Sequence, residues 1–117
     1  MNEEERRVNI DQITGALPFP SEIREDFGAF VADTVMGGVW SRSGLSPRER
    51  SLITIAALTA LDRPNELRLH LGMGLDNGLE RAEICEIIMH MAVYGGFPVA
   101  VEGMRIAKEI FEGRDTA

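Results

Sequence analysis

The sequence predicts an all-α fold, and three observations lead to this class. Apolar residues recur at helical spacing along most of the chain, prolines and glycines flank each such stretch, and no run of alternating apolar and polar residues indicates a β-strand. The chain has 117 residues, of which 44% are apolar and 26% charged. This length and balance are typical of a globular protein that needs no disulfides to fold.

Residues 1–20 are polar and only weakly periodic, so we expect an N-terminal arm or short helix there that leans on a partner. The helical domain is expected to span residues 21–117. Its first helix should follow Ser21, because serine is a common N-cap, and should end at the glycine pair Gly37 and Gly38.

The next helix has the clearest start signal in the chain. Ser46 stands at the N-cap, Pro47 at the first helical position and Glu49 at the third, which together form a capping box. Residues 51–61 are apolar on nearly every side of the expected helix. We therefore expect this helix to be the central, buried one.

Three further helices are predicted toward the C-terminus. Their expected ranges are 64–77, 80–94 and 98–112, and a glycine ends each of them. Inside these helices lie Gly72, Gly74 and Gly103, although glycine destabilises a helix by up to about 1 kcal/mol relative to alanine. We expect these glycines to allow close approach of neighbouring helices.

Charge is distributed unevenly along the chain. Nineteen acidic residues against 12 basic ones give a net charge of −7, which argues against a nucleic-acid-binding protein. Residues 35–70 nevertheless carry five arginines against only Glu49, Asp62 and Glu66. This cationic middle indicates either a site for an anion or ordinary solvated helix faces.

Cys85 is the only cysteine of the sequence, so an intrachain disulfide framework, a multi-cysteine zinc site and a CxxC redox pair are excluded. We expect Cys85 to act as a small buried hydrophobic residue. The sequence begins without an apolar signal core and has no stretch long enough to span a membrane. The expected location is therefore the cytoplasm.

Both histidines occur in the same local pattern, Glu-x-x-x-His. The pairs are Glu66 with His70 and Glu86 with His90, and residues four apart share one face of a helix. A carboxylate beside an imidazole fixes its tautomer and raises its pKa, which favours a proton donor near neutral pH. The alternatives are a surface ion pair, a core histidine, or a metal site built from both pairs, and we expect no metal because helical dimetal sites use Glu-x-x-His spacing.

Four more residues are candidates for binding a small molecule. Arg48 and Arg50 lie in the first turn of the central helix, where either guanidinium would hold a carboxylate or be solvated. Trp40 and Tyr94 are the only tryptophan and the only tyrosine, and each lies near a glycine turn. They would line a pocket or pack in the core.

Six segments, in this order and at these spacings, resemble the carboxymuconolactone decarboxylase family, in particular its gamma-carboxymuconolactone decarboxylase branch. The segments are Gly37–Leu45, Arg48–Leu58, Ala60–His70, Asn77–Gly78, Glu83–Glu86 and Ala92–Pro98. The resemblance covers residues 27–112. It implies an orthogonal bundle of five to six helices, of the alkylhydroperoxidase D-like type, and a homo-oligomer such as a trimer or a hexamer built as a trimer of dimers.

The antioxidant branch of this fold carries a C-x-x-C-x-x-x-H motif. Laid on this chain, its two cysteines fall on Arg63 and Glu66 and its histidine on His70. The resemblance therefore implies no CxxC peroxidase, because the thiol pair is missing.

The resemblance implies a lyase of the β-ketoadipate pathway. This enzyme would convert 4-carboxymuconolactone, an anionic lactone, to β-ketoadipate enol-lactone without a cofactor, because the unsaturated lactone is its own electron sink. Oriented by Glu66, His70 would be the proton donor, and His90 would line the same pocket or stabilise the oxyanion. Arg48 or Arg50 would hold a carboxylate, and Trp40 and Tyr94 would exclude water.

Two departures from the family pattern leave alternatives open. Relatives often have an acidic residue where Gly38 stands, and they have a longer N-terminal arm. One alternative is an isomerase or decarboxylase of another unsaturated lactone or ketone, for example in secondary metabolism. Others are a non-catalytic oligomeric ligand-binding protein and a peroxidase that uses Cys85 alone.

Overall fold

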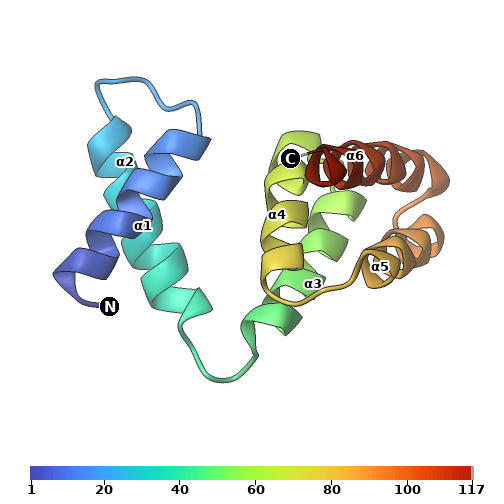
Figure 1. The fold of residues 1–117 in the computed structure, drawn as a ribbon, viewed down its shortest axis with the longest axis horizontal. Coiled ribbons are helices and arrows are strands. Elements are labelled where there is room, and N and C mark those ends of the chain that lie inside the picture. Colours follow the sequence, from blue (N-terminus) through green and yellow to red (C-terminus); the bar gives the residue numbers. More distant parts are fainter. Residues whose placement is uncertain (117) are drawn as a thin grey trace. The chain divides into compact units, whose positions relative to one another are not determined.

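The computed structural model describes residues 1–116, and its regular elements are all helical (Figure 1). They are α1 (Glu3–Ala16), α2 (Arg24–Val31), the π-helix η1 (Ala32–Trp40), α3 (Pro47–Ala60), α4 (Pro64–Asp76), α5 (Arg81–Tyr94) and α6 (Phe97–Asp115). No strand occurs in residues 1–116, so the predicted all-α class with five to six helices is confirmed, and the structure has six α-helices in this range. Within this range, no helix combines the length and apolar character needed to cross a lipid bilayer.

The chain forms two compact units, which divide after Gly44. In the first unit, α1 packs against both α2 and η1. Residues 1–20 therefore belong to the same unit as the helices that follow them. The division of the chain into an arm of residues 1–20 and a helical domain of residues 21–117 remains a prediction.

Two expectations about α2 are wrong. The helix begins at Arg24 after Ile23, and the hydroxyl group of Ser21 bonds to the carboxylate of Glu22 at 3.0 Å instead of capping the helix. The helical path also continues through the glycine pair, as the π-helix η1, and ends at Trp40. Such i→i+5 winding is rare in proteins and is not signalled by apolar periodicity.

In the second unit, α3 has the predicted capping box. The backbone N–H of Glu49 donates to Oγ of Ser46 at 3.1 Å, and the backbone N–H of Ser46 donates to Oε1 of Glu49 at 2.8 Å. The helix packs against α4, α5 and α6, as expected for the central element. Its fully buried residues are Ser51, Ile55 and Thr59.

The remaining helices surround α3 and enclose the core. The helix α5 begins with a capping box that we did not predict, because its N-cap residue is Glu80 instead of the usual serine or threonine. The helix α6 runs through Gly113 to Asp115, beyond its predicted end. The buried core of this unit consists of Ile55, Leu67, Leu71, Leu79, Ile84, Ile88, Ala100, Ile106 and Ala107.

Two of the three helix glycines do permit close packing. A Cβ atom on Gly74 would lie 2.9 Å from Cδ1 of Ile55, and one on Gly103 would lie 3.1 Å from Cγ2 of Ile88. Gly74 therefore brings α4 close to α3, and Gly103 brings α6 close to α5. A Cβ atom on Gly72 would make only an ordinary contact, at 3.5 Å from Arg114.

Candidate active site

Glu66 and His70 lie four residues apart on one side of α4, and the end of that side contacts α3. Asn77 follows the last turn of α4, and its side-chain N–H donates to Oγ of Ser51 on α3 at 3.0 Å. Residues 66, 70, 73 and 77 follow one another at spacings of three and four, so they form one stripe along the helix. This stripe, which we call the α3-facing stripe, carries both Glu66 and His70.

The opposite flank of α4 faces α6. Arg68 donates to Glu109 of α6 at 2.8 Å, and Arg114 of α6 donates to the carbonyl oxygen of Gly72 at 3.0 Å. These contacts fix the rotation of α4 about its axis. By helix spacing, His70 falls on the stripe that ends at Asn77, away from the residues that contact α6.

His70 is half-buried, whereas Glu66 is exposed. Burial lowers the pKa of His70 below its ordinary value of 6.5, and the nearby charge of Glu66 opposes this change only in part. The predicted increase in the pKa of His70 is therefore wrong in sign. Near neutral pH and without a ligand, the imidazole is mainly neutral.

The two candidate arginines have different surroundings. The guanidinium of Arg48 forms an ion pair with Glu83 in the first turn of α5, so its charge already holds a carboxylate of the protein. Arg50 is half-buried and its Nε atom is inaccessible to solvent. Arg50 lies in the first turns of α3, directly before Ser51.

Asn77 is seven residues beyond His70, which corresponds to about 10 Å along the axis of α4. The first turn of α3 is thus separated from His70 by roughly two helical turns.

On α5, the side chains of Glu86, His90 and Tyr94 form a second stripe at spacings of four residues. The rings of His90 and Tyr94 lie 4.9 Å apart at an interplanar angle of 33°. Both residues are exposed, and Tyr94 retains 75% of its accessible surface. The predicted role of Tyr94 in excluding water from a substrate remains a prediction.

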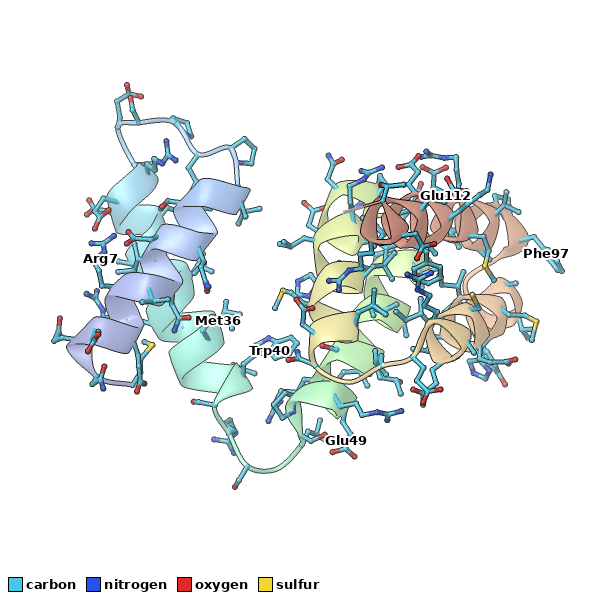
Figure 2. All side chains as sticks on the ribbon, in the orientation of Figure 1. Arg7, Met36, Trp40, Glu49, Phe97 and Glu112 are labelled. Atoms are coloured by element: carbon cyan, nitrogen blue, oxygen red, sulfur yellow. The ribbon has the colours of Figure 1, made fainter. Side chains whose placement is uncertain are left out.

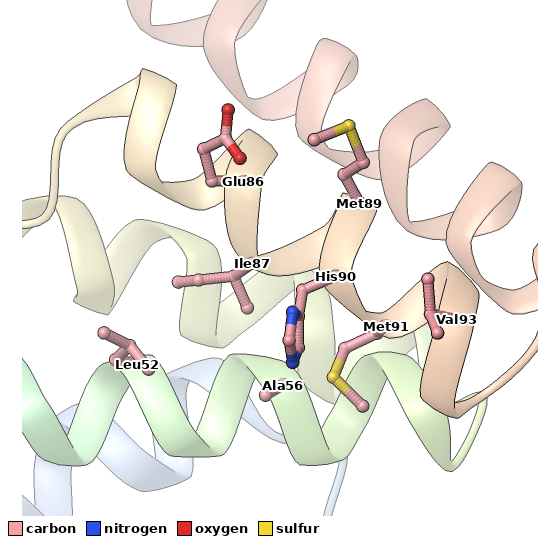
Figure 3. Close-up of a pocket in the computed structure, with 8 residues that line it drawn as sticks. All are labelled: Leu52, Ala56, Glu86, Ile87, Met89, His90, Met91 and Val93. Carbon is pink, nitrogen blue, oxygen red and sulfur yellow. The ribbon is translucent and has the colours of Figure 1, made fainter.

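An open cavity of about 520 Å³ lies between α3 and α5. His90 projects from α5 toward Ala56 of α3, with Leu52 and Met91 on either side (Figure 3). The lining residues are Leu52, Ala56, Glu86, Ile87, Met89, His90, Met91 and Val93. His70 is not among them, so this cavity does not bring the two histidines together.

Trp40 belongs to the first unit, where it is half-buried at the end of η1 (Figure 2). Its predicted contact with a substrate remains a prediction. In residues 1–116, no group of three or more His, Cys, Asp or Glu side chains is arranged to hold a metal ion. Cys85 is half-buried on α5, rather than fully buried as expected.

Sequence reasoning missed the pair of Ser51 and Asn77. Asn77 was interpreted only as the end of the expected helix and as part of the family segment Asn77–Gly78. The available signal was Ser51 itself, a polar residue on the buried face of the central helix. A buried hydroxyl group requires a hydrogen-bond partner, and the partner is an amide on the neighbouring helix.

Comparisons with known proteins agree with this architecture. The model of the carboxymuconolactone decarboxylase family matches residues 25–109, and the chain belongs to this family. It is 41% identical over 92 residues to the 4-carboxymuconolactone decarboxylase of Acinetobacter baylyi, covering 79% of this chain and 69% of that protein. The resemblance inferred from the six sequence segments is thus confirmed.

Two more distant relatives were also found. The nitrosuccinic acid decarboxylase npaB of Metarhizium robertsii is 32% identical over 97 residues, covering 83% of this chain and 65% of that protein. An uncharacterized 15.0 kDa protein of Paracoccus denitrificans is 34% identical over 82 residues, covering 68% and 60%. The chain therefore spans less than two thirds of the length of these two relatives.

Proposed function

We propose that this chain is a cofactor-independent decarboxylase that converts 4-carboxymuconolactone to β-ketoadipate enol-lactone, with His70 as the proton donor. The observation that carries the proposal is the 41% identity to an enzyme named for this substrate. The half-buried imidazole on the α3-facing stripe supports it, because a proton donor needs partial shielding from water.

The substrate itself supplies the electron sink. When the C–C bond to the carboxylate breaks, CO₂ leaves and the electron pair moves through the ring double bond into the lactone carbonyl. A dienolate forms, and a proton must then reach the carbon next to that carbonyl. The protein is required only to bind the anion, stabilise the charge and deliver the proton.

The lowered pKa of His70 is compatible with this role if a negative charge on the bound substrate raises that pKa. A carboxylate bound beside the imidazole favours its protonated form, as Glu66 already does in part. The proton would thus be taken up when the anionic substrate binds. It would be transferred to carbon after CO₂ has left and the negative charge of the carboxylate has moved onto the dienolate.

Arg50 is the arginine that we assign to the substrate. Its neighbour Arg48 is engaged by Glu83, and removing it from that pair would leave Glu83 with only its bond to the backbone N–H of Glu80. A guanidinium binds a carboxylate with two parallel hydrogen bonds, which orients as well as attracts the substrate. His90 receives no part in the chemical step, since its cavity is not lined by His70.

A second candidate substrate is suggested by the relative named nitrosuccinic acid decarboxylase. Nitrosuccinate has a nitro group on the carbon that carries the departing carboxylate, so the electrons released with CO₂ pass into the nitro group. The same binding, shielding and proton transfer would serve both reactions. The two differ in the shape of the substrate, which is cyclic and conjugated in one and open-chain in the other.

We also propose that the chain acts as a homo-oligomer. Large apolar side chains are exposed on α5 and α6, where Phe97 is one of the outward-facing residues (Figure 2). They are Met89 (56% exposed), Val93 (75%), Phe97 (73%) and Val101 (65%). Burial of such a patch between copies would remove apolar surface from water.

The test is to incubate the purified chain with 4-carboxymuconolactone and, separately, with nitrosuccinate, and to measure CO₂ release together with the ultraviolet absorbance of the lactone. We expect catalytic turnover of the lactone, with the His70→Ala protein as the inactive control. A folded protein that releases CO₂ from nitrosuccinate alone would support the second candidate. Release from neither compound would contradict the decarboxylase proposal and leave a ligand-binding role.

A further inference from the structure

By its sequence, Asn77 is the asparagine of this chain that is most prone to deamidation. The chain has asparagines at positions 2, 9, 65 and 77, and only Asn77 precedes a glycine. An asparagine side chain loses ammonia when the backbone nitrogen of the next residue attacks its amide carbon. Glycine has no Cβ atom to hinder this attack, and its backbone turns most freely into the required geometry.

The reaction has two steps, and water is the only co-reactant. In the first step, the nitrogen of Gly78 bonds to Cγ of Asn77, and Nδ2 leaves as ammonia with the proton of the Gly78 N–H group. A five-membered imide remains. Water then adds to one of the two imide carbonyls and opens the ring. The product is aspartate when Gly78 stays joined to the backbone carbonyl, and isoaspartate when it stays joined to the side chain.

The fold holds the nitrogen atom that would attack. The backbone N–H of Gly78 donates to the carbonyl oxygen of Leu75 at 3.2 Å. The N–H of the next residue, Leu79, donates to the carbonyl oxygen of Gly74 at 2.9 Å. With Gly78 at a φ of 102°, these two bonds form a Schellman motif at the end of α4. Leu79 is only 3% exposed, so the core anchors this turn.

The fold also holds the carbon atom that would be attacked. Nδ2 of Asn77 donates to Oγ of Ser51 at 3.0 Å, and Ser51 is fully buried on α3. The ψ angle of Asn77 is 6°, so the nitrogen of Gly78 lies on the side of the backbone nitrogen of Asn77 rather than of its Cβ atom. The two reacting groups are therefore kept apart while the end of α4 stays closed against α3.

We propose that Asn77 is a modification site, and that its hydrogen bond to Ser51 and the Schellman turn suppress its spontaneous deamidation. The reaction then proceeds when this turn opens locally, since short segments open without unfolding of the whole chain. Asn77 is half-buried and Gly78 is exposed, so water reaches the imide once it has formed. The inference does not depend on which substrate the chain acts on.

Deamidation would disturb the junction of α4 with α3. Isoaspartate inserts one additional carbon atom into the backbone before Gly78, which breaks the register of the Schellman motif. Either product also replaces the neutral amide by a negative charge, at a helix end that already has negative partial charge. We therefore expect the modified chain to melt at a lower temperature than the unmodified one.

The test follows the deamidation of the whole folded chain at mildly alkaline pH by mass spectrometry of the peptide that contains Asn77. Chromatography separates the isoaspartate form. Ser51→Ala removes the hydroxyl group that holds the amide. In this folded variant we expect deamidation at Asn77 to be about 2- to 10-fold faster than in the wild type, the range that corresponds to the loss of one hydrogen bond.

The matched control is Thr59→Val, which removes another buried hydroxyl group of α3. Thr59 is 1% exposed, and its hydroxyl donates to the carbonyl oxygen of Ile55 in the same helix at 2.8 Å. This change should leave the rate at Asn77 within about 2-fold. A second reference is the wild-type chain unfolded in guanidinium chloride, where Asn77 should deamidate faster than in the folded chain by about 10-fold or more.

Equal rates at Asn77 in the wild type and in folded Ser51→Ala would overturn the inference, and so would an equal acceleration in Thr59→Val. If Ser51→Ala does not fold in a melting experiment, the folded and unfolded wild type decide, because equal rates would show that the fold gives no protection. In the unfolded chain, Asn77 should also react faster than Asn9 and Asn65. A slower reaction at Asn77 would remove the premise.

Discussion

The chain contains the pattern Glu-x-x-x-His twice, on α4 and on α5, and the two copies have different surroundings. On α4, His70 is half-buried on the side of the central helix, and burial lowers its pKa. On α5, His90 is exposed, contacts the ring of Tyr94 and borders an open apolar cavity. The spacing of the motif is the same, so the motif alone does not decide which histidine does chemistry.

The difference arises from the neighbouring helices. Helix geometry places each histidine on the same face as the glutamate four positions before it. How much water reaches the imidazole is determined by the helices that pack against it. On α4, contacts to α3 and α6 hold both flanks, and His70 is half-buried. A shielded imidazole responds strongly to an added charge, because its electrostatic interactions are less screened.

The largest expected effect comes from removing each histidine in turn. His70→Ala should lower kcat by about 10²- to 10⁴-fold, because a general acid typically contributes that factor. His90→Ala, at an exposed position, should change kcat by less than about 3-fold. The measurement is the rate of CO₂ release at saturating substrate, with melting temperatures to show that both variants are folded.

Equal losses in the two variants would contradict the comparison. They would place His90 in the same site as His70, as the resemblance to the family implied. A loss in His90→Ala alone would move the proton donor to the cavity between α3 and α5.

The second largest expected effect is a loss of stability at the glycines that pack against neighbouring helices. One such contact involves α4, which carries His70, and another involves α5, which carries His90. Gly74→Ala would press a methyl group against Ile55, and Gly103→Ala would press one against Ile88. Both should lower the free energy of unfolding by about 1–3 kcal/mol, the usual effect of overpacking. Only Gly74→Ala displaces α4 from α3, so it alone should also lower kcat.

Urea denaturation measures the stability of both glycine variants. Gly113→Ala is the control, since nothing lies within 4 Å of its added methyl group. There the exchange should stabilise α6 by up to about 1 kcal/mol. A Gly74→Ala protein with unchanged kcat would show that the distance between α3 and α4 does not govern the position of His70.

How much of the fold and of the site could be predicted from the sequence depends on how far apart in the sequence the interacting residues are. The capping box of α3 was predicted in full because Ser46, Pro47 and Glu49 are adjacent in sequence and act through local hydrogen bonds. The all-α class followed from periodicity for the same reason. The family resemblance rested on the order of short segments and was confirmed by the comparisons.

The site was predicted less well, because its properties depend on residues distant in sequence. The pKa of His70 changes in the direction opposite to the one that its local pair with Glu66 suggests, since burial outweighs the charge. Arg48 is engaged by Glu83, which lies 35 positions away. The glycine pair of η1 was interpreted as a helix end because π-helical winding has no simple sequence pattern.

The smallest effect expected is a shift in a pH profile, and it tests the electrostatic part of the comparison. Glu66 raises the pKa of His70, although burial lowers it more, so Glu66→Gln should lower that pKa further. If protonated His70 is required, kcat/KM falls as the pH rises through the pKa of the free enzyme. That decline lies below pH 6.5 in the wild type and should move to lower pH in Glu66→Gln.

Glu86→Gln, the same change in the second motif, should leave the profile in place. A profile that moves with Glu86 instead, or that moves upward with Glu66→Gln, would show that His70 is not the group whose protonation controls the reaction.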